Sequence, residues 1–182
     1  GGYHTCAVTL EQEVQCWGDD SEGQSTPPEG TFLSVDAGKR HTCGVTTEQI
    51  ALCWGWDSSN QLEVSGEEDV ALMAAGGRHT CVLYLDGSIV CGGAHDYLQN
   101  FGIGTAESVV QIDAGLDHNC GVTETNLLRC AGRDDSSQSN PPAGYYFHAA
   151  AGYEHSCALA LTGDLVCWGS NDQGQLDLPG GQ

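Results

Sequence analysis

Short stretches in which apolar and polar residues alternate follow one another along this chain, separated by turns rich in Asp, Asn, Ser and Gly. Alternation with a period of two predicts half-buried β-strands, and no segment shows the 3.6-residue periodicity of an amphipathic helix. The segment from Cys81 to Cys91 is typical, because the turn signal Asp86-Gly87 divides two such stretches. The pattern therefore predicts an all-β protein built from hairpins.

The hairpin can be placed in register from its loop. A three-residue loop at 85–87, with its glycine in the left-handed conformation, sets Cys81 opposite Cys91 and Leu83 opposite Ile89. Directly opposed cysteines on neighbouring strands have the Cβ separation that a disulfide needs. The same register gives each hairpin one face with a cystine and an aliphatic pair: Val8 with Val14, Val45 with Ala51, Val122 with Leu128, and Leu159 with Leu165.

This hairpin recurs five times, with the first cysteines 37 to 39 residues apart. The expected disulfides join Cys6 to Cys16, Cys43 to Cys53, Cys81 to Cys91, Cys120 to Cys130, and Cys157 to Cys167. Each unit also has a glycine five residues and a histidine two residues before its first cysteine, and a glutamine eight residues after its second. The histidines are His4, His41, His79, His118 and His155, and the glutamines are Gln24, Gln61, Gln99, Gln138 and Gln175. A fixed period of this length indicates one supersecondary unit repeated in a row.

A third strand is predicted before four of the hairpins, at 32–37, 70–75, 109–114 and 145–151. Small antiparallel sheets at this period predict a β-propeller of five short blades, each with one disulfide-bridged hairpin. An open β-solenoid is the main alternative. We expect one domain over 1–182, with repeats at approximately 1–30, 31–68, 69–107, 108–144 and 145–182. Because the first unit lacks its third strand, we expect a ring one strand short, a strand supplied by a partner, or an excerpt of a longer propeller.

Charge and cysteine content limit the partners and the cellular compartment to be expected for this chain. The chain has 25 acidic and only 5 basic residues, a net charge of -20, so nucleic acid and anionic lipid are disfavoured as partners. No apolar run approaches the ~20 residues needed to cross a membrane. Ten cysteines in register predict disulfides, an oxidising compartment and a secreted protein. Zinc is the rival interpretation, but closely spaced Cys-x-x-Cys pairs are absent and each unit would supply only three ligands.

The fifth unit carries a motif in full: Gly152, His155, Ala158-Leu159, Gly163, Val166, Trp168-Gly169, Asn171 and Gly174-Gln175-Leu176. This pattern resembles the repeat of the regulator of chromosome condensation family, and the resemblance covers essentially the whole chain. It implies a β-propeller, typically of seven blades, that serves as a protein-binding platform. The units are shorter than the family's, and Gly92 and Ala131 replace the tryptophan in units three and four. The nuclear, chromatin-binding activity of the family's best-known member is not expected here, because the chain is strongly acidic.

The repeated histidines and glutamines are expected to be structural. Each histidine should bond backbone in its own blade, and a metal-binding histidine ring is the alternative. The acidic loops could attract calcium, but none has the spacing of a calcium-binding loop, so we expect no metal and no other cofactor.

Binding specificity should come from residues that break the repeat. Trp56, His95, Tyr97 and Phe101 are the candidates, because aromatic side chains carry much of the energy at interfaces and also stack on sugars. No catalytic motif occurs. We therefore expect a secreted, non-catalytic module that binds protein or self-assembles. A lectin-like glycan binder is the alternative, and a glycoside hydrolase using paired carboxylates is less favoured.

Overall fold

The computed structural model describes residues 1–99 and 107–178, and in these ranges the only regular elements are fourteen β-strands. They are β1 (His4–Val8), β2 (Val14–Gly18), β3 (Phe32–Ala37), β4 (His41–Thr46), β5 (Ala51–Gly55), β6 (Val70–Ala75), β7 (His79–Tyr84), β8 (Ile89–Gly93), β9 (Val109–Ala114), β10 (His118–Thr123), β11 (Leu128–Gly132), β12 (Tyr146–Ala151), β13 (His155–Ala160) and β14 (Leu165–Gly169). The described ranges hold no helical segment with the length and apolar character needed to span a bilayer.

The strands form five antiparallel sheets, which we call blades 1 to 5. Blade 1 is the hairpin β1-β2, and the other four blades have three strands each: β3-β4-β5, β6-β7-β8, β9-β10-β11 and β12-β13-β14. The prediction of an all-β protein with one disulfide-linked hairpin per blade is confirmed. So are the four predicted third strands, each of which pairs with the first strand of the hairpin that follows it.

The predicted hairpin register is also confirmed. Cys81 opposes Cys91 and Leu83 opposes Ile89, and the cysteines are directly opposed in the other four blades as well. The loop residue needs a left-handed backbone in every blade, with φ between 63° and 92° at Gln12, Gln49, Gly87, Asn126 and Gly163. All ten cysteines are paired within their hairpins, with Cα–Cα separations of 4.0 to 4.1 Å.

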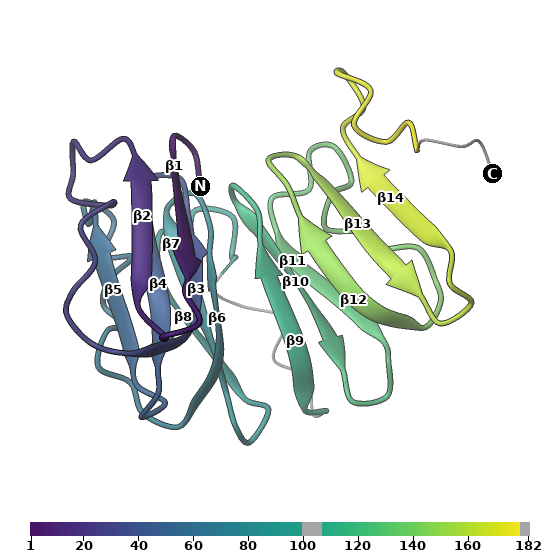
Figure 1. The fold of residues 1–182 in the computed structure, drawn as a ribbon. Helices are drawn as coiled ribbons and strands as arrows, with labels where there is room; N and C mark the ends of the chain where they lie inside the picture. The colour runs from purple at the N-terminus through teal and green to yellow at the C-terminus, as the bar shows by residue number, and fades with distance from the viewer. Residues whose placement is uncertain (100–106, 179–182) are drawn as a thin grey trace.

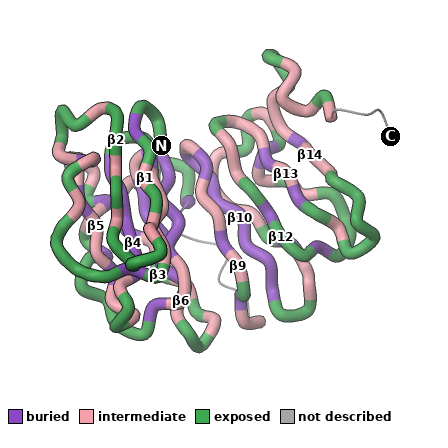
Figure 2. Tube along the Cα trace, in the orientation of Figure 1, coloured by how far each residue is buried: buried purple, intermediate pink, exposed green. Residues whose placement is uncertain are grey.

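The blades follow one another in chain order around an arc, and in Figure 1 blade 1 lies in front of blade 2 on the left while blade 5 lies on the right. The core lies between consecutive blades rather than within any one of them, as the buried strands of the middle blades show in Figure 2. Between blades 2 and 3, for example, Cys43, Val45 and Ala51 pack on Val70 and Met73. Similar clusters fill the junctions between blades 3 and 4 and between blades 4 and 5. The cystine-bearing faces of blades 2, 3 and 4 are therefore covered by the blades that follow them.

Histidines add polar contacts to these junctions. Nε2 of His41 lies 2.9 Å from the Thr80 hydroxyl of the next blade, and His4 contacts Thr42 in the same way at 2.8 Å. The expected partner was backbone of the same blade. The difference arises because the histidine lies on the face of the sheet that meets the next blade, where a hydroxyl is within reach.

The glycine before each histidine allows the rings to fit. A Cβ atom on Gly38 would lie 2.5 Å from Cε1 of His41 and 2.5 Å from the carbonyl oxygen of Gly76 in the next blade. Both separations are too short for any side chain. Glycine is thus required here by the histidine ring and by close approach of neighbouring backbones, which explains the repeated Gly-x-x-His spacing.

The repeated glutamines organise the loop that follows each hairpin. In every blade the glutamine Oε1 accepts a backbone N–H from two residues earlier, at 2.8 to 3.0 Å. The glutamine's own carbonyl then faces the next blade: that of Gln24 accepts bonds from Trp54 Nε1 at 3.0 Å and from the Thr42 hydroxyl at 2.8 Å. The carbonyl of Gln138 likewise accepts hydrogen bonds from Trp168 Nε1 and from the Ser156 hydroxyl.

Replacing both Cys81 and Cys91 by Ser should lower the free energy of unfolding by about 2–3 kcal/mol, because the bond restricts the unfolded chain over a short loop. Equilibrium urea unfolding measures the change. Leu85→Ala, at the exposed tip of the same hairpin, is the control and should stay within about 0.5 kcal/mol of the parent. A loss near zero for the double variant would show that the pair does not constrain the chain.

Stability should fall as the pH drops below neutrality. Burial lowers the pKa of His41 and His118 to about 4 and that of His79 to about 3, from an unfolded value of 6.5. Their contribution is fully present above pH 6.5, and it is lost between pH 6.5 and the folded values because only the unfolded chain takes up protons there. Each histidine contributes about 1.4 kcal/mol per pH unit in that window.

Two carboxyls oppose this trend, because burial raises the pKa of both Asp36 and Asp113. Burial raises the pKa of Asp113 from 3.8 to about 6, so its contribution is lost as the pH rises between those values. The three histidines outweigh the two carboxyls, and urea unfolding at pH 7.5, 6 and 5 should show decreasing stability. His41→Asn should reduce the number of protons that the chain takes up on unfolding by about one, so stability should fall less steeply as the pH decreases. A stability that is flat or rising toward pH 5 would contradict the neutral, buried state of these rings.

Candidate interaction surface

Short turns from all five blades come together at one edge of the sheets, next to the axis that the blades surround. In blades 2 to 5 these turns join the first strand to the second, and residues 1–3 occupy the same place in blade 1. They surround a cavity of about 410 Å³. Its walls are mostly glycine and alanine backbone, and its larger side chains are Tyr3, Lys39, Leu116 and Tyr153.

Backbone hydrogen bonds between neighbouring turns hold this ring together. The N–H of Gly2 donates to the carbonyl of Gly38 at 3.2 Å, and Lys39 donates to Gly76 at 3.1 Å. The same contact recurs from Gly77 and Leu116 to the following blades. Because these amides are used between blades, the turns form a rigid frame from which the larger side chains project.

The loop after each hairpin forms a second, outer ring at the same end. Its first residue donates its N–H to the turn of the same blade, as Trp56 does to the Arg40 carbonyl and Arg133 to that of Asp117, at 2.9 and 2.8 Å. Within the loop, Asp57 accepts the N–H of the residue five positions later. Asp20, Asp134 and Asn171 do the same in blades 1, 4 and 5, while His95 stands at this position in blade 3. The loop carboxylates thus serve as turn acceptors.

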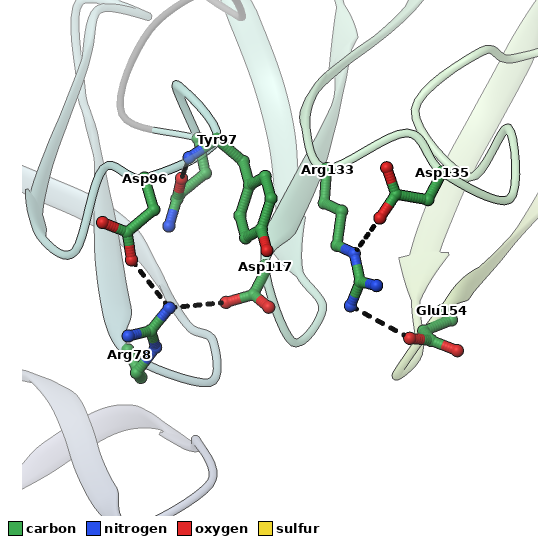
Figure 3. Close-up of polar contacts among 8 residues, drawn as sticks. Arg78, Asp96, Tyr97, Asp117, Arg133, Asp135 and Glu154 are labelled. Atoms are coloured by element: carbon green, nitrogen blue, oxygen red, sulfur yellow. Dashed lines mark hydrogen bonds and ion pairs between the residues drawn. The ribbon is translucent and has the colours of Figure 1, made fainter.

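Arginines link the loops of blades 3, 4 and 5, as Figure 3 shows. Arg78 lies 2.8 Å from Asp96 in its own blade and 3.7 Å from Asp117 in the next. Arg133 lies 2.7 Å from Asp135 and 3.1 Å from Glu154 of blade 5. Its guanidinium carbon also lies 5.6 Å from the centre of the Tyr97 ring of blade 3.

These ion pairs add little stability, because exposed pairs contribute about 0–1 kcal/mol. Their effect is geometric. Arg133 fixes the half-exposed Tyr97 ring from one side, and the acidic neighbours hold both guanidinium groups in place. The network gives the loops of three blades a defined arrangement at the surface.

We call this end of the molecule the rim surface. It comprises Tyr3, Lys39, Arg40, Trp56, Arg78, His95, Asp96, Tyr97, Leu116, Arg133 and Tyr153. It carries four of the five basic residues of a chain whose net charge is -20. A second cavity, of about 360 Å³, lies on it between the loops of blades 2 and 3, and is lined by Arg78, His95 and Asp96 among others.

The structure places three of the four predicted binding residues on the rim surface. Trp56 is partly buried, whereas His95 and Tyr97 are exposed. Phe101 lies outside the described residues. Tyr3 and Tyr153, exposed by 75% and 60%, were missed by the sequence reasoning. The sequence could have identified them, because each follows the repeated glycine by one or two positions. Residues at these positions lie in the turns that surround the central cavity.

The repeated histidines are not part of this surface. His4, His41, His79 and His118 are buried in the blade junctions, and His155 is partly buried at the same position in blade 5. In the two described ranges, no group of three or more His, Cys, Asp or Glu side chains is arranged to hold a metal ion. The buried carboxylates of Asp36 and Asp113 each accept a backbone N–H from a neighbouring blade, at 2.7 Å. That contact is structural and leaves no pair of free carboxylates in the junctions concerned.

Comparison with family models identifies the repeat. The model for the regulator of chromosome condensation (RCC1) repeat matches residues 1–24, 32–61, 109–138 and 148–175, which together make up more than half of the chain. The unmatched third unit is one of the two in which the motif tryptophan is replaced, by Gly92. The comparison with curated proteins gave no match.

Solved structures show the same fold. The CRINKLY WD40 ectodomain of the receptor kinase ACR4 from Arabidopsis thaliana is 25% identical, with a TM-score of 0.75 over 92% of this chain and 62% of that one. The ectodomain of the receptor kinase CR4 from Physcomitrella patens is 26% identical, with a TM-score of 0.74 over 92% of this chain and 48% of that one. Yeast RCC1 (Prp20), solved bound to Kap60, is 18% identical, with a TM-score of 0.79 over 93% and 55%.

This chain therefore spans roughly half to three fifths of the length of the structures that it resembles. The family match agrees with the blade architecture, the hairpin register and the Gly-x-x-His turns described above. The chain belongs to the regulator of chromosome condensation (RCC1) repeat family.

Proposed function

We propose that this protein is an extracellular, non-catalytic module that binds a protein partner through the rim surface. The observation that carries the proposal is the set of aromatic and arginine side chains that project from the frame of turns and loops at this edge of the blades. Exposed Tyr, Trp and Arg side chains supply most of the binding energy at protein interfaces. Here Trp56 and Tyr97 lie on neighbouring loops, and Arg133 fixes the orientation of the tyrosine.

The extracellular setting has two supports. Five disulfides are typical of an oxidising compartment. The two similar structures at 25% and 26% identity are both ectodomains of plant receptor kinases. RCC1-type propellers are in general binding scaffolds rather than catalysts, in keeping with the use of the buried carboxylates as backbone acceptors.

The charge of the chain indicates the charge that the surface of its partner should carry. With a net charge of -20, the molecule attracts a basic protein surface and repels an acidic one. The arginines of the rim surface are already paired with Asp96, Asp117, Asp135 and Glu154, so they orient the surface instead of neutralising an acidic ligand. We therefore expect a basic partner whose association slows as salt is added.

Site-specific photocrosslinking tests the proposal. A photoreactive phenylalanine analogue at Tyr97 should give a discrete adduct with an extracellular protein of the organism that makes this chain. The same probe at Leu85, exposed at the opposite end of blade 3, should not give that adduct. Equal adducts from both positions would show that the rim surface is not the binding site.

Substitution then measures the contribution of the aromatic side chains. With the crosslinked protein purified, Trp56→Ala combined with Tyr97→Ala should weaken binding at least about tenfold, whereas Leu85→Ala should leave it unchanged. Biolayer interferometry at 50 and 300 mM salt gives both the affinity and the salt dependence. If the chain instead binds simple sugars on a glycan array and the double variant abolishes that binding, the surface is a lectin site and the proposal fails.

A further inference from the structure

Blade 3 lacks the tryptophan that fills part of the junction with the preceding blade elsewhere. In blades 2 and 5 this residue, Trp54 or Trp168, is buried and donates its Nε1–H to a glutamine carbonyl of the preceding blade. Blade 3 has Gly92 at the same position, opposite Thr80 on the neighbouring strand. The space that a tryptophan would fill between blades 2 and 3 is therefore open to other side chains.

The loop of blade 2 supplies the side chains that occupy this space. A Cβ atom on Gly92 would lie 2.6 Å from Cγ of Glu63 and 3.1 Å from Cγ1 of Val64. Val64 is buried in the junction, whereas Glu63 is exposed and its Oε1 accepts the N–H of Gly93 at 3.2 Å. The glycine thus allows a carboxylate to lie where other junctions hold an indole ring.

Glu63 forms part of the wall of the second cavity of the rim surface, which has a volume of about 360 Å³. The other lining residues are Ser59 and Asn60 of the same loop, Arg78 of the blade 3 turn, and residues 93–96. Blades 2 and 3 each have a described neighbour on both sides. The cavity therefore lies within the blade stack, and it exists at this junction because of the change from tryptophan to glycine.

The charges around the cavity favour a cationic ligand. Arg78 is the only arginine or lysine among the lining residues, and Figure 3 shows it between two carboxylates, 2.8 Å from Asp96 and 3.7 Å from Asp117. Glu63, by contrast, takes part in no ion pair within residues 1–99 and 107–178. Its charge is left without a partner, and the net charge of -20 adds to the attraction for cations.

We propose that this cavity receives an arginine side chain of the protein that binds the rim surface, and that Glu63 pairs with its guanidinium group. A guanidinium group is more weakly hydrated than an ammonium group and presents several N–H donors in one plane, which suits a half-open polar cavity. The side-chain oxygens of Ser59 and Asn60 can accept further donors. This inference rests on the proposed function, and it assigns the preference for a basic partner to one junction.

Nuclear magnetic resonance titration with a small probe tests the site on the chain alone. The probe is N-acetylarginine amide, and N-acetylcitrulline amide is the control because it has nearly the same shape and no charge. The arginine probe should shift the amide signal of Gly93, since that N–H is bonded to the Glu63 carboxylate. The citrulline probe should not. Equal shifts with both probes, or a shift with neither, would overturn the proposal.

Two variants test the residues that form the site. Glu63→Gln keeps an acceptor for the Gly93 N–H but removes the charge, so affinity for the arginine probe should fall about threefold, the effect of an exposed ion pair. Gly92→Ala retains every charge but places a Cβ 2.6 Å from Glu63 Cγ, so it should weaken binding by displacing the carboxylate. Glu48→Gln, the same charge change in the turn between β4 and β5, should bind like the parent. Either cavity variant binding as tightly as the parent would overturn the assignment.

The same variants separate this inference from the proposed function. Binding of the protein that crosslinks at Tyr97 should weaken about threefold in Glu63→Gln and stay unchanged in Glu48→Gln. If that protein binds the rim surface and Glu63→Gln has no effect, the proposed function stands and the present inference fails. If no protein crosslinks at Tyr97 but the arginine probe still shifts the Gly93 signal, the proposed function fails and the cavity remains an arginine site. Far-UV circular dichroism and thermal unfolding confirm that each variant is folded.

Discussion

The apolar face of each blade must be covered by its neighbour, and the rest of this structure depends on that constraint. A sheet of two or three short strands cannot bury an apolar face by itself, so each blade is stable only within the stack. The cystine narrows the conformations open to each hairpin, and the aliphatic pair beside it provides the surface to be buried. Histidine, glutamine and tryptophan then satisfy polar groups across the junction, and glycine lets the backbones come close enough for these contacts to form.

Much of this could be predicted from the sequence, because the controlling interactions inside a hairpin are local. A spacing of ten residues and a three-residue loop fix the cysteines opposite each other, and the left-handed loop residue follows from the same count. Even Gln12 and Gln49, poor choices for that conformation, adopt it, since the surrounding ladder leaves no alternative. Contacts between blades were harder to predict from the sequence. The hydroxyl partners of His4, His41 and His118 lie 38 or 39 residues away in the sequence, and no local rule decides which face of the sheet meets which neighbour.

The rim surface, too, could be predicted from the sequence only in part. Its aromatic candidates Trp56, His95 and Tyr97 were found because they interrupt the repeat. Their arrangement was not predictable, since the contact of Arg133 with Tyr97 depends on how far neighbouring blades are rotated about the axis. Tyr153 was overlooked although it also differs from its counterparts in the other units: it directly follows the repeated Gly152, in a turn that lines the central cavity. Repetition identifies the scaffold, and a binding surface must be assembled from residues contributed by several units.

The third blade departs from the common junction, and this makes the stack uneven. Gly92 replaces the tryptophan, Asn119 of blade 4 replaces the hydroxyl residue, and neither ring nitrogen of the buried His79 has a hydrogen-bond partner among the described residues. A buried polar group without a partner costs about 1–3 kcal/mol. In a nearest-neighbour array, such a cost is concentrated at one seam. The junction between blades 3 and 4 therefore carries a cost that the histidine–hydroxyl contacts avoid at the other three, and its opening would leave two blocks that each keep their own cystines. Because Tyr97 and Arg133 lie on opposite sides of that seam, opening it would also divide the rim surface.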